Sequence, residues 1–427
     1  MKPLIPFIEN YRYDFAILNK YGIVLNDFPD ESYEQSSTSF RFCVVGLFIH
    51  RDYRIMVYPK NYKKPNDIKD QHKETANLIK SIQKYNRKSK KSDLIYQSTN
   101  GKLSKRENYI GSMIFIIEHY LNHGLIYREQ KEFKKNSNKK IHWNKTMSSV
   151  VPDVFNSTTV YLDTYSNVKM KDYDNDITRL HKLALIESLY QLGFLFSMDY
   201  SHYDYEYYEL NNDFINHKNK YEYQLQMKLS NTFNDTTLEL LNNIKSILFD
   251  TSLSETKHKI IPIITFNFEL VWQDVVSECF KNEVKRYQEY FPSLDIIYKS
   301  AEEHRPQLPD VVYQSAPNSW YILDAKYYDV DFNRPSKGDY LKQYFYEFSF
   351  KYNGDSITNA LIFNTNGADV EYLGNALIKE ATNPFLKDKT IHMIGLNQRA
   401  AYEYYSKNQS TNYYRSLITD VIHKNNK

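Results

Sequence analysis

Two runs of β-forming residues in the C-terminal part of the chain constrain its fold more than any other feature. Leu308–Tyr313 and Trp320–Tyr327 are rich in Val, Ile and aromatic residues, and the short segment between them, Ser315–Ser319, contains Pro317. Two β-rich runs joined by a short turn-forming segment are typical of a β-hairpin. We therefore expect both runs to be neighbouring antiparallel strands.

This hairpin brings charged side chains together. Because side chains alternate along a strand, Asp324 and Lys326 project from the same face. With the turn centred on Pro317, Asp310 lies directly opposite Asp324. Opposed like charges, with Cβ atoms roughly 5 Å apart, destabilise a sheet unless a positive group lies between them. An oxygen-rich pair with room for water suits Mg²⁺, with Mn²⁺ as the alternative ion. Lys326 can then position a water for attack on phosphorus.

A third carboxylate is predicted from helical phase. Asn267–Tyr287 has helical periodicity, and at about 100° per residue Glu269 falls within about 20° of Val276, in the middle of the apolar face. A carboxylate that points into a core must be paired or bind a metal. We therefore expect Glu269 to complete the metal cluster. The alternative is a partly exposed Glu at a helix start, favoured by the helix dipole.

The residues after the hairpin predict the rest of a domain. Asp339–Phe350 has the pattern of an amphipathic helix, and Gln343 is the polar residue that we place toward the edge of the active site. Ala360–Phe363 and Thr390–Ile394 predict two more strands. This order predicts an α/β (α+β) fold with a central mixed sheet flanked by helices. The residues expected to face inward on the helix are Leu341, Tyr344, Phe345 and Phe348.

The first 200 residues predict a mixed β/α module. Arg41–Ile49 and Tyr53–Tyr58 are typical of a hairpin, and Ile177–Phe196 has the apolar spacing of a long helix. Asp204–Lys259 is polar, with weak helical periodicity. We therefore expect an N-terminal module at 1–200, a helical connector at 201–259 and a C-terminal domain at 260–427. The sequence contains no GxxxxGK phosphate loop, so a nucleotide hydrolysis step would need another chain.

Composition limits the classes of partner and compartment. The formal net charge is only +3, so a nucleic-acid partner would have to be bound by local basic patches. The two cysteines, Cys43 and Cys279, are too few for a Cys-rich zinc site or a disulfide framework. No run approaches the roughly 18 apolar residues of a membrane span. We expect a cytoplasmic protein that does not cross a membrane.

The motifs together resemble a known superfamily. The pattern Glu269, Pro309-Asp310 and Asp324-Ala325-Lys326, followed by Gln343 and Tyr346 on a helix, resembles the PD-(D/E)XK nucleases. Other segments resemble the LlaJI-type relatives of McrC, the nuclease subunit of McrBC-like restriction systems. These segments are Val45–Phe48, Val57–Lys60, Ile141–Thr146, Asp176–His181 and Phe268–Trp272. Gln273 departs from the pattern, because family members often carry a second Glu there, and the spacing of Gln343 and Tyr346 is one residue tighter than the commoner QxxxY.

The resemblance implies a site, a substrate and a partner. The catalytic residues would be Glu269, Asp310, Asp324, Lys326 and Gln343, with the metal held by Asp310, Asp324, Glu269 and the backbone carbonyl of Ala325. The substrate would be double-stranded DNA, and cutting both strands requires two nuclease centres, which dimerisation would supply, or two successive cuts. An McrB-like AAA+ GTPase would be the partner of the N-terminal half.

The docking segment and the overall function each leave alternatives open. Ile141–Thr146, with the basic run before it, is the docking candidate, and the alternative is an ordinary strand and loop. The chain as a whole is expected to be the endonuclease subunit of a motor-dependent restriction system. A stand-alone type II endonuclease and an inactive DNA-binding scaffold are the alternatives. The intact Asp310, Asp324 and Lys326 argue against the scaffold.

Overall fold

The structure is a computed structural model of the 427-residue chain. It describes residues 3–50, 53–89, 105–156, 158–196, 198, 203–249, 260–298, 301–328, 334–350, 356–379 and 389–425. The chain divides into two compact units. The helical unit contains the described residues of Ser104–Gly193 and Met198–Leu253, and the sheet unit contains those of Lys2–Leu103, Phe194–Ser197 and Ser254–Lys427. The functional modules expected at 1–200, 201–259 and 260–427 stay a prediction.

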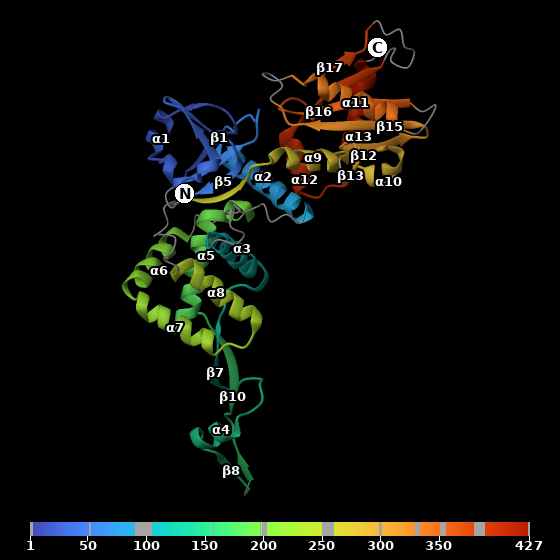
Figure 1. The fold of residues 1–427 in the computed structure, drawn as a ribbon. Helices are drawn as coiled ribbons and strands as arrows, with labels where there is room; N and C mark the ends of the chain where they lie inside the picture. The colour runs from blue at the N-terminus through green and yellow to red at the C-terminus, as the bar shows by residue number, and fades with distance from the viewer. Residues whose placement is uncertain are drawn as a thin grey trace. The chain divides into compact units, whose positions relative to one another are not determined.

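The C-terminal part of the sheet unit is built on a five-stranded sheet with the order β14-β15-β16-β18-β17 (Figure 1). The β14/β15 and β17/β18 pairs are antiparallel, whereas β15/β16 and β16/β18 are parallel. The predicted mixed sheet is therefore confirmed. Its strands are β14 (Val311–Ala316), β15 (Ser319–Lys326), β16 (Ser356–Thr365), β17 (Val370–Leu377) and β18 (Thr390–Asn397).

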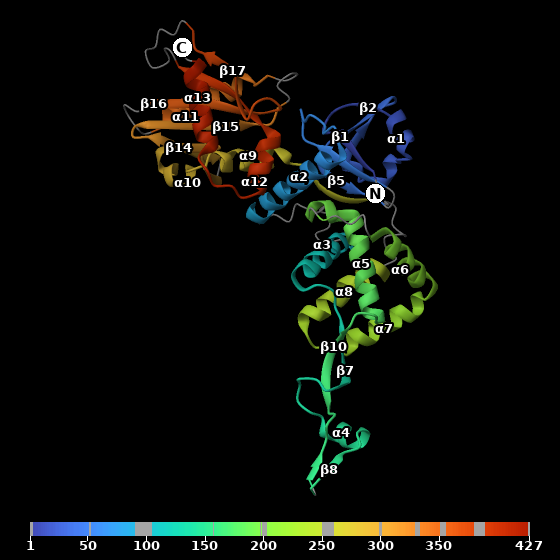
Figure 2. The same ribbon diagram turned by 180° about the vertical axis from the view of Figure 1, so that it is seen from behind.

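Helices cover both faces of this sheet (Figure 2). On one face Trp320 and Ile322 of β15 are buried in a cluster with Tyr346 of α11. On the other face Tyr321 contacts Thr419 of α13 through their hydroxyl groups. The sheet lies between apolar layers, as predicted. The helices are α9 (Phe268–Cys279), α10 (Val284–Tyr287), α11 (Lys337–Ser349), α12 (Gln398–Ser406) and α13 (Tyr413–Asn425), and a separate hairpin is formed by β12 (Ser293–Tyr298) and β13 (Ala301–Pro306).

The helix expected over Asn267–Tyr287 is two helices in the structure. The helix α9 ends at Cys279, Lys281 then has a left-handed φ of 47°, and α10 begins at Val284. Asn282 in this break donates from Nδ2 to the carbonyl of Asp310 at 2.7 Å and accepts from the backbone N–H of Val312 at 3.0 Å. The break therefore ties the helix pair to the start of β14, which sequence periodicity does not reveal.

The expected inward face of α11 is largely wrong. Leu341, Phe345 and Phe348 are exposed, whereas Gln343 and Glu347 are buried. Nε2 of Gln343 donates to two strand carbonyls and Glu347 pairs with Lys389 at 2.6 Å, whereas Oε1 of Gln343 has no hydrogen-bond partner among the described residues. Tertiary hydrogen bonds, rather than apolar spacing, set the orientation of this helix.

The N-terminal residues of the sheet unit form a second sheet with the order β1-β6-β5-β11. The predicted hairpin is confirmed between β5 and β6, and Arg51 and Asp52 of its turn lie outside the described residues. Gly46 has a φ of 141°, and a Cβ there would lie 2.1 Å from the Ile263 carbonyl oxygen, so β11 can approach β5 only at a glycine. The strands are β1 (Leu4–Ile8), β5 (Val45–Ile49), β6 (Arg54–Tyr58) and β11 (Ile261–Thr265).

Smaller elements complete this part of the sheet unit. Three short strands pair in the order β2-β4-β3 and bury Phe40 and Phe42 against β1 and β5. The long helix α2 packs on α9 and α12, where Lys84 is ion-paired with Glu278. Because of β11 and α2, the first 89 residues and the C-terminal sheet share one unit. The elements are β2 (Tyr13–Asp14), α1 (Ala16–Tyr21), β3 (Tyr33–Gln35), β4 (Ser39–Phe42) and α2 (Ile68–Ser89).

The helical unit packs α3 and α5 against α7 and α8, and it includes the segment expected to be a connector. From it extends the arm, which we define as the described residues of Arg128–Asp172 (Figures 1 and 2). The helices are α3 (Lys105–His123), α5 (Asp176–Leu192), α6 (Asp204–Asn216), α7 (Lys218–Ser230) and α8 (Asp235–Phe249). The arm contains β7 (Arg128–Lys135), α4 (Trp143–Ser149), β8 (Asp153–Phe155), β9 (Thr158–Val160) and β10 (Tyr165–Asp172). None of the described helices has the length and apolar character needed to cross a membrane.

Candidate active site

The register of the β14/β15 hairpin places two carboxylates opposite one another. Val311 pairs with Leu323, so the residue before β14, Asp310, faces Asp324 as the sequence predicts. Oδ2 of Asp310 accepts a hydrogen bond from the backbone N–H of Ala325 at 2.8 Å, which fixes the carboxylate against the end of β15. Asp324 is only 1% exposed. A buried charge of this kind must be paired or neutralised.

Burial and the neighbouring carboxylate together change the protonation of Asp310. Burial and then the charge of Asp324 raise the pKa of Asp310 from 3.8 to about 6. The hydrogen bond from Ala325 and the charges of Lys342 and Lys326 act in the opposite direction but do not cancel the rise. The pair therefore holds excess negative charge that a cation would relieve.

Lys326 bridges two acidic residues. Its Nζ lies 2.6 Å from Oδ2 of Asp324 and 2.7 Å from Oδ1 of Asp339. Burial alone would lower the pKa of Lys326, but these carboxylates raise it, so the ammonium stays charged. Asp339 also belongs to the capping box of α11, where it accepts from the Ser336 backbone N–H at 2.8 Å. Burial opposes ionisation of Asp339, but hydrogen bonds from Lys326 and Ser336 lower its pKa to about 2.

A second lysine reaches the pair from α11. Nζ of Lys342 lies 3.3 Å from Oδ1 of Asp324, and the side chain is 49% exposed. Burial lowers the pKa of Lys342, but the combined effects of Asp324, Tyr346 and Asp310 exceed it and raise that pKa. Sequence reasoning missed both Asp339 and Lys342. The Ser-x-x-Asp capping box identifies Asp339 as the start of a helix, but no sequence signal points to Lys342.

Glu269 and Gln343 lie apart from this pair. Glu269 is exposed, in the first turn of α9, and its charge acts on the buried Glu9. Helical phase gives a side chain's direction around the axis, but a side chain in the first turn leans back past the helix start, beyond the packed face. Gln343 is buried, and its Nε2 donates to the carbonyl oxygens of Ile322 and Ala360 at 3.1 and 3.2 Å. It links β15 and β16 beneath the site. The expected core position of Glu269 and edge position of Gln343 are therefore wrong, and their roles stay predictions.

The donor set fits a hard divalent cation. Within the described residues, no three His, Cys, Asp or Glu side chains gather closely enough to hold a metal. Mg²⁺, however, is usually bound through only one or two carboxylates and keeps several waters. Asp310 and Asp324 provide the two carboxylates, and the pKa of Asp310 is raised first by burial and then by the charge of Asp324. The residues present therefore fit Mg²⁺ or Mn²⁺ with water as the remaining ligands.

Comparison with known proteins assigns the family. The sequence profile of the LlaJI restriction endonucleases matches residues 44–377, and the chain belongs to this restriction endonuclease family. Membership places it among the nucleases. It is similar to the component YdjA of the type II restriction enzyme BsuMI from Bacillus subtilis (strain 168), with 22% identity over 96% of this chain and 92% of the relative.

Two solved assemblies from Thermococcus gammatolerans also align with the chain. One is a half-complex from a tetradecameric assembly of McrB AAA+ hexamers with bound McrC, with a TM-score of 0.37, 11% identity and coverage of 95% of this chain and 98% of that chain. The other is an McrBC complex, with a TM-score of 0.21, 11% identity and coverage of 57% and 79%. Scores this low do not establish a common fold.

Proposed function

We propose that the chain is a Mg²⁺-dependent endonuclease subunit that hydrolyses DNA phosphodiester bonds at Asp310, Asp324 and Lys326. The observation that supports this most strongly is the opposed carboxylate pair at the end of the β14/β15 hairpin, with Lys326 within 2.6 Å of Asp324. Asp324 is paired with Lys326 and Lys342, whereas Asp310 makes no ion pair among the described residues. Two acids facing one another, one of them with a raised pKa, favour a cation site.

The proposed mechanism assigns a task to each side chain. Asp310 and Asp324, with the backbone carbonyl of Ala325, would hold the ion; Mg²⁺ supplies charge neutralisation at the phosphate and a more acidic water. Asp339 holds Lys326 in place and keeps it charged, so its ammonium can orient the attacking water or stabilise charge on the phosphate oxygens. The half-exposed Lys342 can contact the same phosphate from the α11 side. No histidine base is required.

The test of this site is cleavage of plasmid DNA with Mg²⁺ by the wild-type chain and by Asp324→Asn. We expect the substitution to abolish cutting, because it removes a ligand and the partner of two lysines. Asp420→Asn is the matched control, since Asp420 is exposed on α13, and it should cut normally. Cutting by a folded Asp324→Asn at the wild-type rate would disprove the assignment.

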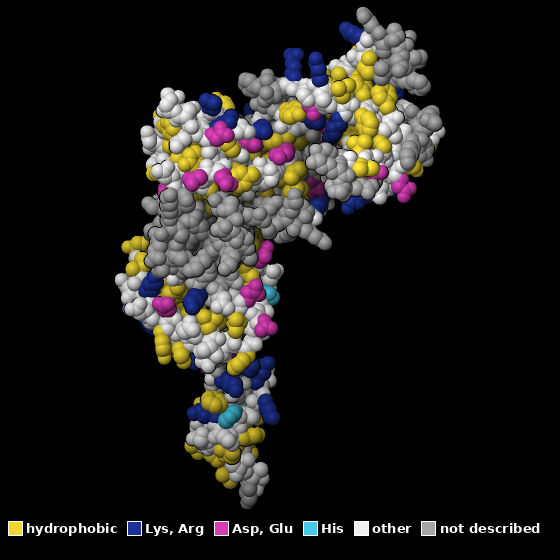
Figure 3. Space-filling model, in the orientation of Figure 1, with side chains coloured by type: hydrophobic (Ala, Val, Ile, Leu, Met, Phe, Trp, Pro, Cys, Tyr) yellow, Lys and Arg dark blue, Asp and Glu magenta, His cyan; other side chains and the backbone are white. Residues whose placement is uncertain are grey.

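We further propose that the arm docks to an McrB-like AAA+ GTPase. The predicted segment Ile141–Thr146 lies on the arm, where His142 caps α4 and Trp143 is 51% exposed. The part of the arm around β8 carries apolar side chains that contribute to no core, including Val151 at 89% and Phe155 at 66% exposed. Figure 3 shows hydrophobic side chains in yellow toward the far part of the arm, with Lys and Arg in dark blue nearer the helices. Exposed apolar surface of this kind marks an interaction site.

The relative in Bacillus subtilis is named as a component of a restriction enzyme, which supports a multi-subunit assembly. The test is co-purification of the chain with an McrB-like AAA+ GTPase. A variant with Trp143→Ala and Phe155→Ala should lose the complex. Tyr223→Ala, which removes an exposed aromatic side chain from α7 in the same unit, should keep it. DNA cutting at full rate without any AAA+ protein would instead support a stand-alone type II endonuclease.

A further inference from the structure

A cavity of about 690 Å³ in the sheet unit adjoins the end of β15. Its walls come from the loop after β1, the residues after β6 and the residues after Lys326. The lining residues used below are Glu9, Tyr11, Arg12, Lys60, Tyr327 and Tyr328. Strands distant in the sequence thus meet at one hollow, and its volume lies in the range of small-ligand sites.

Hydrogen bonds connect this cavity to the candidate active site. The hydroxyl of Tyr328 donates to Oδ2 of Asp339 at 3.2 Å, and Oδ1 of the same carboxylate holds Lys326 at 2.7 Å. Tyr327 is the next residue after Lys326 on the chain, and its hydroxyl accepts from the backbone N–H of Lys60 at 2.9 Å. A ligand in the cavity would therefore lie beside the strand that carries the catalytic residues.

The cavity is lined by a buried acceptor. Glu9 is 8% exposed, and its Oε2 accepts a hydrogen bond from the Tyr327 hydroxyl. Its Oε1 lies 3.8 Å from the Lys60 ammonium, an ion pair beyond hydrogen-bond distance. Burial raises the pKa of Glu9 despite that lysine. A phosphate beside this carboxyl would be repelled, whereas an N–H donor would be attracted.

The other lining residues of this cavity include cations and an exposed aromatic ring. Arg12 is exposed and has no ion-pair partner among the residues that the structure describes. The Lys60 side chain is 30% exposed. Tyr11 is 59% exposed, and its ring lies 4.8 Å from that of Tyr13, which fixes one aromatic surface beside the opening. Cations beside an exposed aromatic ring suit a ligand in which an anionic group is attached to a planar ring, because the cation can pair with the anion and the two rings can stack.

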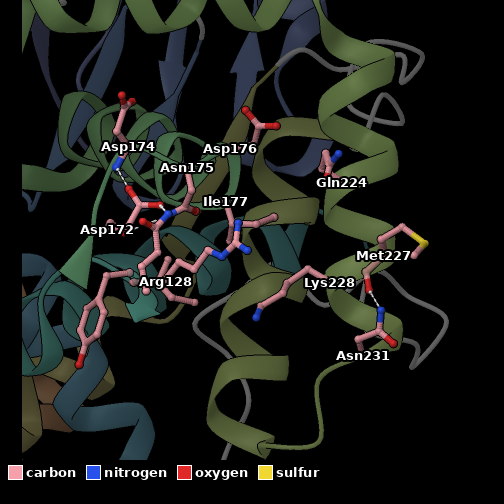
Figure 4. A pocket seen from close by; sticks show the side chains of 13 residues that line it. Arg128, Asp172, Asp174, Asn175, Asp176, Ile177, Gln224, Met227, Lys228 and Asn231 are labelled. Carbon is pink, nitrogen blue, oxygen red and sulfur yellow. Dashed lines mark hydrogen bonds between the residues drawn. The ribbon is translucent and has the colours of Figure 1, made fainter. Parts of the chain in front are cut away.

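A second large cavity has a different lining. It measures about 680 Å³, lies in the helical unit and presents Asp172, Asp174 and Asp176 (Figure 4). Two of these carboxylates are already paired, Asp174 with Arg179 at 2.9 Å and Asp176 with Lys220 at 3.1 Å. Two of its three carboxylates therefore already have cationic partners within the unit.

We propose that the cavity beside β15 binds one nucleotide of the substrate strand next to the scissile phosphate. Its phosphate contacts Arg12, its base packs on Tyr11, and an exocyclic amino group of adenine or cytosine donates to Glu9. A base can reach this position only after it has left the helical stack. Carboxylates accept from the amino group of cytosine in the same way in groove recognition. This inference rests on the proposed nuclease function, because that function makes DNA the ligand.

The test measures binding of free nucleotides to the full chain in EDTA, with ligand-observed NMR and with dCMP, dTMP and inorganic phosphate as probes. We expect dCMP to bind roughly tenfold more tightly than dTMP, which has no amino group, and phosphate to bind most weakly. Glu9→Gln should remove the preference for dCMP, because its amide presents a donor as well as an acceptor. Equal binding of dCMP and dTMP would overturn the proposal.

Two exposed positions keep the test informative if Glu9→Gln does not fold. Tyr11→Ala and Arg12→Gln should each weaken both nucleotides several-fold, whereas Lys20→Gln, an exposed cation of α1 outside the cavity, should change neither. Unchanged binding in both cavity variants would also overturn the proposal. Because the assay contains no metal, it can be run with Asp324→Asn. If the wild type binds nucleotides with the expected preference but does not cut DNA, the nuclease site alone is refuted. If it cuts DNA but shows no nucleotide preference, the proposal for the cavity alone is refuted.

Discussion

Lowering the pH tests the opposed carboxylates quantitatively. Burial and the charge of Asp324 raise the pKa of Asp310 from 3.8 to about 6. The folded chain therefore retains a proton that the unfolded chain loses, so Asp310's contribution to stability is present below pH 3.8 and is lost as the pH rises through about 6. A divalent cation needs the ionised carboxylate, so its affinity follows the opposite trend and increases as the pH rises.

The expected change in metal affinity between pH 7 and pH 5 follows from the raised and the ordinary pKa of Asp310. With a pKa of about 6, about nine-tenths of Asp310 is ionised at pH 7 and about one-tenth at pH 5, so metal affinity should fall about tenfold. With the ordinary value of 3.8, the loss over the same interval would be under about 10%. Lys326 and Lys342 do not titrate in this range, because their pKa values are raised from 10.5.

The assay is a Mn²⁺ titration followed by electron paramagnetic resonance of the free ion at pH 7 and pH 5. Asp310→Asn is the control, because it removes both a ligand and the titrating group. The variant should bind weakly at both values of pH. Equal affinity of the wild type at pH 7 and pH 5 would refute the reasoning about the pair.

Three further substitutions follow from the contacts around the site. Lys342→Gln should lower kcat of plasmid cleavage by roughly tenfold while thermal stability is kept, because the lysine is 49% exposed but adjoins Asp324; unchanged kcat would exclude Lys342 from the chemistry. Asp339→Asn should reduce cleavage more strongly and lower the thermal midpoint by a few degrees, since it removes the anionic partner of Lys326 and weakens a helix cap. Asn282→Ala should cost about 1 to 3 kcal/mol in urea unfolding, because the side chain bonds both Asp310 and Val312; a smaller cost would show that the helix break does not secure β14.

The carboxylate pair could be predicted because its determinants are local. The turn at Asn318, with a φ of 62°, and the alternation along β15 fix the register of the hairpin between Val311 and Gln314. The bulge between Gln314 and Ala316 lies nearer the turn and does not change this register. Nothing beyond the hairpin is needed to place Asp310 against Asp324. The family resemblance is also correct, because the motifs that support it lie within the matched residues 44–377.

The side-chain positions that were predicted wrongly or missed depend on contacts between residues far apart in the sequence. Apolar spacing on α11 predicts Phe345 inward, but the carbonyls of β15 and β16 select Gln343 instead. Phase around α9 places Glu269 on the apolar face but does not show that α9 begins at Phe268, which leaves Glu269 at the helix end. Lys342 reaches Asp324 only after α11 has docked. Sequence periodicity contains no information on any of these three contacts.

The most direct test of the central claim is the location of the bound metal. Crystals of the chain soaked in Mn²⁺ should give an anomalous difference peak between the carboxylates of Asp310 and Asp324. A peak there, lost in Asp324→Asn, is the result that the proposed site predicts. A fully soaked crystal with no peak between the two carboxylates, or with its strongest peak at another group, would contradict the account.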